Sequence, residues 1–133
     1  MRVLVCGGRT WGVFLKGKSK GAAIGEQQML FYALHGLDIT EIIHGGAQGA
    51  DALAGRWARA HAIKETRIEA DWLKYGRAAG PIRNAQMLEL KPDLVVALRG
   101  GKGTADMVKR AQVAGIEVKA VGWELCPMTP SRP

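Results

Sequence analysis

The order of hydrophobic and polar residues along the chain predicts five β-strands, three from short apolar runs and two from alternation of polar and apolar residues. Short apolar runs predict strands at 2–6, 41–44 and 94–98. The last of these runs is continuously apolar, which is typical of a strand covered on both faces. Alternation of polar and apolar residues at 66–70 and 116–121 predicts two half-exposed strands.

A helical period, with apolar residues three and four positions apart, predicts helices between these strands. Apolar residues three and four positions apart indicate helices at about 25–37, 50–62, 81–91 and 104–114. Pro81 suits the first position of the third helix. The remaining stretches lack a period, so we expect a mobile basic loop before the first helix and irregular chain at 71–80 with at most one short helical turn.

Strands that alternate with helices predict an α/β fold, a single Rossmann-like domain with a five-stranded, mainly parallel sheet and helices on both faces. The two alternating strands belong at the edges, because only an edge tolerates their polarity. The predicted strand order is therefore 3-2-1-4-5, with the topological switch point between strands 1 and 4. We expect this domain to span 1–125 and to be followed by a flexible tail, 126–133, which contains three prolines.

The chain carries a formal charge of +7, and part of this charge is concentrated near the N-terminus. Arg9, Lys16, Lys18 and Lys20 lie together without an acid among them. Such a cluster can attract nucleic acid, an anionic membrane or a small phosphate ester, or it can simply be a solvated surface. We expect a cytoplasmic protein with no membrane segment.

The cysteine and histidine content argues against several classes of site. Two cysteines, Cys6 and Cys126, make neither a disulfide framework nor a zinc site, and we expect a buried, inert Cys6. His44 ends a strand without further ligands at metal spacing, so we expect a structural histidine. No metal and no cofactor is predicted.

Three predicted strands end in paired glycines: Gly7-Gly8, Gly45-Gly46 and Gly100-Gly101. Glycine allows sharp turns and lets a ligand approach the backbone amides, and a following helix supplies free N–H groups for an anion. The alternative is that these glycines only make tight strand–helix turns. Neither the dinucleotide-binding fingerprint nor the P-loop fingerprint is present.

The motifs together resemble the YspA/YpsA-related branch of the SLOG superfamily, over roughly 1–121. They are Gly7-Gly8-Arg9, His44-Gly45-Gly46-Ala47 with Gly49-Ala50-Asp51, Ala70-Asp71-Trp72, Gly80-Pro81-Ile82-Arg83-Asn84 and Gly100-Gly101-Lys102-Gly103-Thr104-Ala105-Asp106. The resemblance implies a Rossmann-like domain for a nucleotide-derived ligand, and a homodimer or larger oligomer. The superfamily includes the lonely-guy phosphoribohydrolases and DNA-processing protein A.

The lonely-guy enzymes carry an Arg-x-x-x-Met helix motif and a Pro-Gly-Gly-x-Gly-Thr-x-Glu loop. Residues 83–87 match the first, and 99–106 are similar to the second, with Arg99 in place of proline and Asp106 in place of the catalytic glutamate. The resemblance implies that Arg83 holds a phosphate and that Asp106 serves an N-glycosidase. The alternatives are a surface salt bridge for Arg83 and a helix-dipole role for Asp106 and Asp51 in the first turns of their helices.

The leading hypothesis is therefore a sensor or sequestering protein that binds a nucleotide-type small molecule on its glycine-rich loops. An N-glycosidase that uses Arg83 and Asp106 is the first alternative, and weak, non-specific nucleic-acid binding is the second. Trp11, Trp72 and Tyr75 lie in predicted loops, where each could stack on a base or pack on the sheet. The expected ligand-binding residues are Gly7, Gly8, Arg9, Thr10, Trp11, Gly45, Gly46, Ala47, Gly49, Asp51, Asp71, Trp72, Pro81, Arg83, Asn84, Gly100, Gly101, Gly103 and Thr104.

Overall fold

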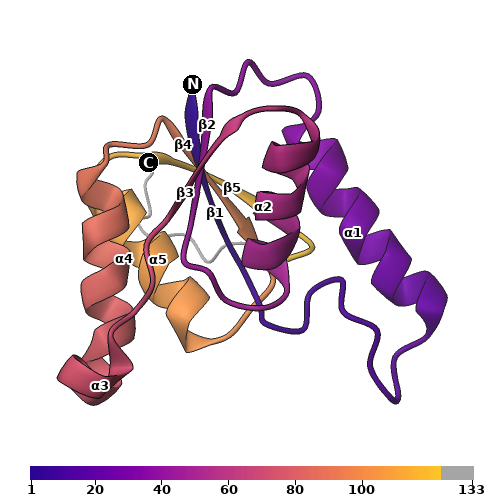
Figure 1. Ribbon diagram of the computed structural model, residues 1–133, viewed down its shortest axis with the longest axis horizontal. Helices are drawn as coiled ribbons and strands as arrows, with labels where there is room; N and C mark the ends of the chain where they lie inside the picture. The colour runs from indigo at the N-terminus through magenta and orange to yellow at the C-terminus, as the bar shows by residue number, and fades with distance from the viewer. Residues whose placement is uncertain (124–133) are drawn as a thin grey trace, which may run out of the picture.

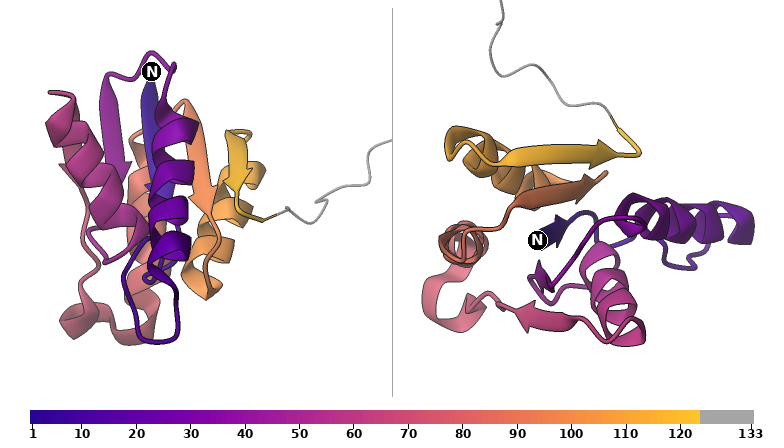
Figure 2. Two further views of the ribbon diagram at one scale, coloured as in Figure 1. Left: turned by 90° about the vertical axis from the view of Figure 1, so that its right-hand side faces the viewer. Right: turned by 90° about the horizontal axis from the view of Figure 1, so that it is seen from above.

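The computed structural model describes residues 1–123 and shows a five-stranded sheet between two layers of helices (Figures 1 and 2). The predicted tail, with Cys126, lies outside the described residues. The elements in chain order are β1 (Arg2–Cys6), α1 (Lys20–Leu34), β2 (Glu41–His44), α2 (Ala50–Ala60), β3 (Lys64–Arg67), α3 (Trp72–Tyr75), the short 3₁₀ turn η1 (Gly76–Ala78), α4 (Ala79–Glu89), β4 (Leu94–Leu98), α5 (Lys102–Val113) and β5 (Glu117–Val121).

The strand order is β3-β2-β1-β4-β5 and all four pairings are parallel, so the predicted order and parallel sheet are confirmed. Every residue of β2 and β4 is buried, whereas β3 and β5 contain exposed and half-buried residues. This difference places β3 and β5 at the edges, because a central strand of a covered sheet has no face open to water.

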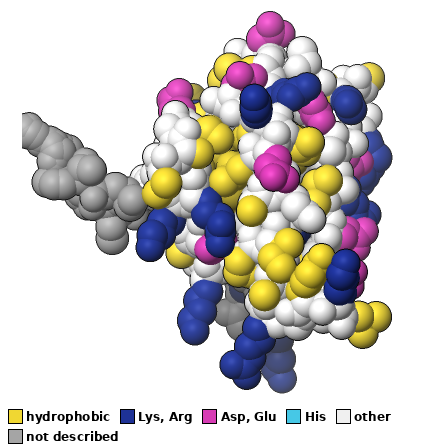
Figure 3. All heavy atoms as spheres, turned by 90° about the vertical axis from the view of Figure 1, so that its left-hand side faces the viewer, with side chains coloured by type: hydrophobic (Ala, Val, Ile, Leu, Met, Phe, Trp, Pro, Cys, Tyr) yellow, Lys and Arg dark blue, Asp and Glu magenta, His cyan; other side chains and the backbone are white. Residues whose placement is uncertain are grey.

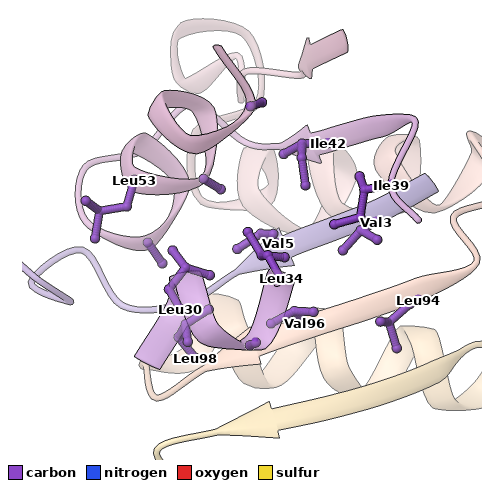
Figure 4. Close-up of a cluster of buried hydrophobic side chains, with 14 of the residues drawn as sticks. Val3, Val5, Leu30, Leu34, Ile39, Ile42, Leu53, Leu94, Val96 and Leu98 are labelled. Atoms are coloured by element: carbon purple, nitrogen blue, oxygen red, sulfur yellow. The ribbon is translucent and has the colours of Figure 1, made fainter. Parts of the chain in front are cut away.

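Helices α1 and α2 cover one face of the sheet (Figure 4). There Leu30 and Leu34 of α1 and Leu53 of α2 pack in one buried cluster with alternate residues of the strands, which include Val3, Val5, Ile42, Val96 and Leu98. Helices α4 and α5 cover the other face, where Met87 and Met107 meet the remaining strand residues, among them Leu4, Ile43 and Val95. The predicted arrangement of helices on both faces is thus confirmed.

The boundaries of two elements differ from the prediction. Helix α1 begins at Lys20 rather than near 25, because the Ser19 side chain accepts a hydrogen bond from the Ala22 amide at 3.0 Å and caps the helix. Strand β3 occupies Lys64–Arg67 rather than 66–70, in register with the four residues of β2. The alternating pattern thus indicated the correct edge of the sheet but the wrong bounds for the strand.

Two further helices begin earlier than predicted. Helix α4 starts at Ala79, so Pro81 is its third residue rather than its first. Proline is tolerated there because the amides of a helix's first turn have no partner within the helix. Helix α5 starts at Lys102 rather than at Thr104, and this shift changes the position of Asp106 in the helix.

The basic loop before α1, predicted to be mobile, is bonded to that helix. The Gly12 amide donates to Glu26 Oε1 at 2.8 Å, and Gln27 Nε2 donates to the Gly12 carbonyl at 2.8 Å. Lys18 Nζ donates to the same Glu26 oxygen at 2.7 Å. Burial raises the pKa of Glu26, but the hydrogen bonds from Lys18 and Gly12 and the charge of Arg99 outweigh it and leave the pKa below its usual value.

Candidate functional site

The glycine-rich loops that follow β1, β2 and β4 meet at one end of the sheet, as expected for the carboxyl ends of parallel strands. They enclose a cavity of about 340 Å³ and a neighbouring cavity of about 430 Å³, which together we call the cleft. Four residues line both cavities: Arg9, Ala47, Trp72 and Arg83. In Figure 3, Lys and Arg side chains project from the lower end of the molecule, where the strands finish.

Some of the loop glycines are required by close packing. The Gly8 amide donates to the Arg99 carbonyl at 3.1 Å, and the Ala50 amide donates to the Gly8 carbonyl at 3.2 Å. A Cβ at Gly100 would lie 2.7 Å from the Gly8 nitrogen, and Gly49 has a φ of +77° that side chains rarely adopt. Neither Gly49 nor Gly100 lines the cleft, so for these two the tight-turn alternative is correct.

Gly101 and Gly103 belong to a different class. A Cβ at either position would meet nothing within 4 Å, and both residues line the smaller cavity together with Lys102 and Thr104. Gly101 is the N-cap of α5 and offers no side chain to its amides, and the first turn of α5 contains no acidic residue. The first turn of α5 is therefore free to bind an anion through backbone N–H groups and the helix dipole.

Arg83 lies beside this helix end and is positioned by neutral oxygens. Its Nη1 donates to the Gly45 carbonyl at 2.9 Å, and its Nε donates to Asn84 Oδ1 at 3.2 Å. No Asp or Glu among residues 1–123 forms an ion pair with Arg83, so the surface salt-bridge alternative is wrong. Since α4 begins at Ala79, Arg83 is its fifth residue and lies beyond the first turn.

Asn84 connects α4 to α5 beneath the cleft. It is 4% exposed, and its Nδ2 donates to the Gly103 carbonyl at 3.1 Å and to Asp106 Oδ2 at 2.9 Å. These hydrogen bonds join residues about twenty positions apart and hold the start of α5 against α4. Asn84 therefore sets the position of both the free helix end and the neighbouring Arg83.

Asp106 does not line the cleft. It lies on a separate groove between α4 and α5, where Arg110 Nε donates to its Oδ2 at 2.8 Å. Because α5 begins at Lys102, Asp106 is in the second turn, and the predicted first-turn role is wrong. The N-glycosidase hypothesis assigned Asp106 to the reacting bond, and in this structure that carboxylate faces another surface.

Asp51 is the acidic residue that lines the smaller cavity. It lies in the first turn of α2, as predicted, and its Oδ2 accepts the amides of Gly45 at 3.0 Å and Ala47 at 3.3 Å. Burial raises the pKa of the Asp51 carboxyl, although these two amides and the charge of Arg83 act in the opposite direction. The smaller cavity thus holds one buried carboxylate together with the exposed Arg9 and Lys102 and the half-buried Arg83.

Several predicted ligand-binding residues lie elsewhere. Trp11 is 2% exposed and packs in the core beneath α1, so its predicted contact with a ligand is wrong for this structure. Asp71 caps α3 by accepting the Lys74 amide at 3.1 Å. Thr10, Asp71, Pro81, Gly49 and Gly100 do not line the cleft, and neither does Tyr75.

The remaining predicted residues do line it. They are Gly7, Gly8, Arg9, Gly45, Gly46, Ala47, Asp51, Trp72, Arg83, Asn84, Gly101, Gly103 and Thr104. Sequence reasoning missed Lys102, which its place within the Gly100–Gly103 loop could have indicated. It also missed Cys6 and Met87, whose apolar character gave no sign of a site. Burial raises the pKa of the Cys6 thiol well above its usual value, so it remains protonated.

His44 has the structural role that the sequence predicted. The Gly46 amide donates to His44 Nδ1 at 3.0 Å, so the proton of the neutral ring is on Nε2, which lies 2.6 Å from Glu65. The hydrogen bond from His44, more than that from Arg59, keeps the pKa of Glu65 below its usual value. Within residues 1–123 no three His, Cys, Asp or Glu side chains converge as a metal site would require, and no helix is long and apolar enough to cross a membrane.

Two comparisons relate this chain to known proteins. Residues 29–75, which include β2, α2, β3 and α3, match the model of the YspA, cpYpsA-related SLOG family. The chain is also 37% identical over 84 residues to the Gene 61 protein of Mycobacterium phage D29, and the match covers 58% of this chain and 67% of the phage protein. The chain belongs to the YspA, cpYpsA-related SLOG family.

Proposed function

We propose that this protein binds a nucleotide-type ligand, with a phosphate group and a ribose, in the cleft, and that it acts as a sensor or a sequestering protein. The observation that carries the proposal is the uncapped N-terminus of α5, which opens into the cavity beside Arg83. A helix end is a common structural feature, whereas a helix end without a cap that faces cations across a cavity is suited to an anion.

The charges of the smaller cavity favour a phosphate, and in the larger cavity the acidic lining residue, Glu69, is paired with Arg67. Arg9, Arg83 and Lys102 line the smaller cavity, and Asp51 is the acidic residue opposing them. Arg9 and Lys102 form no ion pair with any residue in 1–123, so both cations are available to a ligand. A phosphate that accepts bonds from backbone amides and from a guanidinium gains charge-assisted hydrogen bonds, which are the strongest kind.

The shape of the cleft favours a ligand larger than phosphate alone. Cavities of about 340 and 430 Å³ fall within the range of roughly 300–1,000 Å³ that is usual for small-molecule sites. Trp72 lines both cavities and is 50% exposed, so its ring is accessible to a base. Cys6 and Met87 give the smaller cavity an apolar part, as a nucleoside would require.

The position of Asp106 favours binding over turnover. An N-glycosidase needs a carboxylate at the reacting sugar carbon, and Asp106 instead pairs with Arg110 and Asn84 at the groove between α4 and α5. The acid that does line the cavity, Asp51, is bonded to two backbone amides.

The test uses two matched glycines. Gly103 and Gly21 are each the second residue of a helix, and each follows a lysine. Neither has an atom closer than 4.0 Å to an added Cβ, so Gly103→Val and Gly21→Val should fold equally well. Binding of adenosine 5′-monophosphate (AMP) should fall by at least about tenfold in Gly103→Val, because its side chain would cover amides that bind the phosphate.

The measurement is isothermal titration calorimetry on wild type and both variants, with thermal unfolding as the check on folding. Gly21→Val should bind AMP as wild type does. Equal AMP affinity in Gly103→Val and wild type would exclude the start of α5 as the phosphate site. Failure of wild type to bind AMP, ribose 5-phosphate and inorganic phosphate would refute the proposed function itself.

A further inference from the structure

Asp51 has a bonding arrangement that its structural role does not fully explain. The residue is 7% exposed, and its Oδ2 accepts both amide hydrogen bonds, from Gly45 and Ala47. Among residues 1–123 no donor bonds to the other oxygen, Oδ1. No lysine or arginine in this range forms an ion pair with the carboxylate either. Within the described residues Oδ1 is not a fully buried atom, so this unused acceptor is open to the cavity that Asp51 lines, and a ligand that covered it without bonding to it would pay a desolvation cost.

The nearest cation does not supply that bond. Arg83 lies near Asp51, since Arg83 Nη1 and Asp51 Oδ2 would both be within 3.0 Å of a Cβ at Gly45, but Arg83 donates to the Gly45 carbonyl and to Asn84 rather than to Asp51. The Asp51 side chain lines the same cavity as the free start of α5, and the two follow β2 and β4, the strands on either side of β1. The cavity therefore has an end suited to an anion and a hydrogen-bond acceptor at a different place on its wall.

We propose that Asp51 selects the ligand by accepting a hydrogen bond from a hydroxyl or amino group on its non-phosphate part. This inference rests on the proposed function, because it assigns the second half of the same ligand. The negative charge of Asp51 repels a phosphate, so the phosphate must take the α5 end and present a sugar hydroxyl or a base amino group to Asp51.

The charge is otherwise hard to justify. A side chain needed only to hold the Gly45–Ala47 turn could be neutral, because an asparagine oxygen accepts the same two amides. Instead the fold keeps a carboxyl group whose pKa burial has raised, which means that ionisation of Asp51 costs folding stability at neutral pH. Sites that bind ligands commonly retain such a cost in stability.

The test compares Asp51→Asn with a matched control, Asp71→Asn. Both aspartates accept backbone amides, but Asp71 caps α3 and does not line the cleft. In Asp51→Asn the amide-bonded oxygen is retained, while the group facing the cavity becomes an N–H donor. The probes are inorganic phosphate, ribose 5-phosphate and AMP, titrated by calorimetry into wild type and both variants.

Asp51→Asn should weaken ribose 5-phosphate by about tenfold if the donor is a sugar hydroxyl, and should weaken only AMP if the donor is on the base. Affinity for inorganic phosphate should be equal to or higher than that of wild type, because the substitution removes a charge that repels the anion. The melting temperature of Asp51→Asn should be higher than that of wild type at pH 7. This difference should shrink as the pH falls toward the ordinary aspartate pKa, because Asp51 of wild type then becomes protonated in both the folded and the unfolded state. Asp71→Asn should show none of these effects.

Two outcomes would overturn the inference while the proposed function stands. One is that Asp51→Asn binds ribose 5-phosphate and AMP as wild type does. The other is that it loses all three probes and melts at a lower temperature, which would mean that Asp51 only holds the Gly45–Ala47 turn. Wild type that binds none of the probes would overturn both proposals together.

Discussion

Helices α1 and α5 begin with the same dipeptide, Lys-Gly, but their first turns are completed in different ways. At α1 the Ser19 hydroxyl accepts the Ala22 amide at 3.0 Å. At α5 the equivalent position is Gly101, which provides no side-chain acceptor. A serine cap contributes about 1 kcal/mol relative to alanine, and glycine can substitute at a cost of only a few tenths. The chain therefore completes the helix end that serves the fold and leaves the other open.

The basic side chains near the two helix starts also differ, because they are paired at α1 and unpaired within residues 1–123 at α5. Helix α1 follows the basic loop, and there Lys18 is paired with Glu26, which also pairs with Arg99 at the end of β4. The start of α5 lies on the cleft with Arg9 and Lys102, which form no ion pair within residues 1–123. Basic residues near a glycine-rich turn thus serve the fold at one helix end and are available to a ligand at the other. Charge and glycine content alone do not separate these cases.

The largest expected effect comes from giving α5 the cap that α1 already has. Gly101→Ser should weaken AMP binding by about tenfold or more, because the hydroxyl would accept an amide that the phosphate needs. The same variant should unfold at an equal or slightly higher temperature, since a new cap favours the helix. Calorimetry and thermal unfolding measure the two effects. An unchanged affinity would show that the open end of α5 is not a binding feature.

The next effect concerns the carboxylate that holds the loop on α1. Glu26 has a pKa below its usual value, so it contributes stability above the unfolded-state pKa and loses it as the pH falls through the lowered folded-state pKa. Glu26→Gln should therefore lower the free energy of unfolding by about 1 kcal/mol at pH 7. The difference from wild type should disappear under acidic conditions, and urea unfolding at several pH values measures it. If Glu26→Gln were less stable than wild type by the same amount at every pH, the charge of Glu26 would not be the cause.

Removing the cap of α1 should affect stability without affecting the cleft. Ser19→Ala should lower the free energy of unfolding by about 1 kcal/mol, the usual value for the loss of a serine cap. AMP affinity should not change, because the start of α1 does not line either cavity. Chemical denaturation and calorimetry test the two halves of this statement. Loss of AMP binding in Ser19→Ala would mean that the two helix ends are coupled.

The smallest effect is expected at Asp106, on the outer side of α5. Its ion pair with Arg110 joins residues four positions apart on a half-exposed helix face, and such pairs contribute about 0.3–0.5 kcal/mol. Asp106→Asn keeps a side-chain oxygen that can accept from Asn84 Nδ2, so it should change the free energy of unfolding by no more than this and leave AMP affinity within about twofold. If AMP were cleaved by wild type and not by Asp106→Asn, the N-glycosidase hypothesis would replace binding.

The pattern of buried positions was enough to predict the sheet. Strands 41–44 and 94–98 lie where the apolar runs indicated, and the polarity of the two edge strands determined the order. Burial is a property that each residue's hydrophobicity reflects directly. Helix starts were predicted less well. The start of α1 depends on a single cap, Ser19, and Pro81 did not fix the start of α4, because proline is tolerated at several positions of a helix's first turn.

The sequence by itself determined that three glycine-rich turns would meet at the carboxyl ends of the central strands, since strand order and parallel direction follow from local polarity. Only the tertiary structure decided which glycines face a ligand and which side chains share the cavity. Gly49 and Gly100 pack against the Gly8 loop, while Gly101 and Gly103 stay open. Asp51 lines the smaller cavity and Asp106 does not. Hydrogen bonds between residues far apart in the chain determine how each helix is placed, and the periodicity of the sequence does not reveal those contacts.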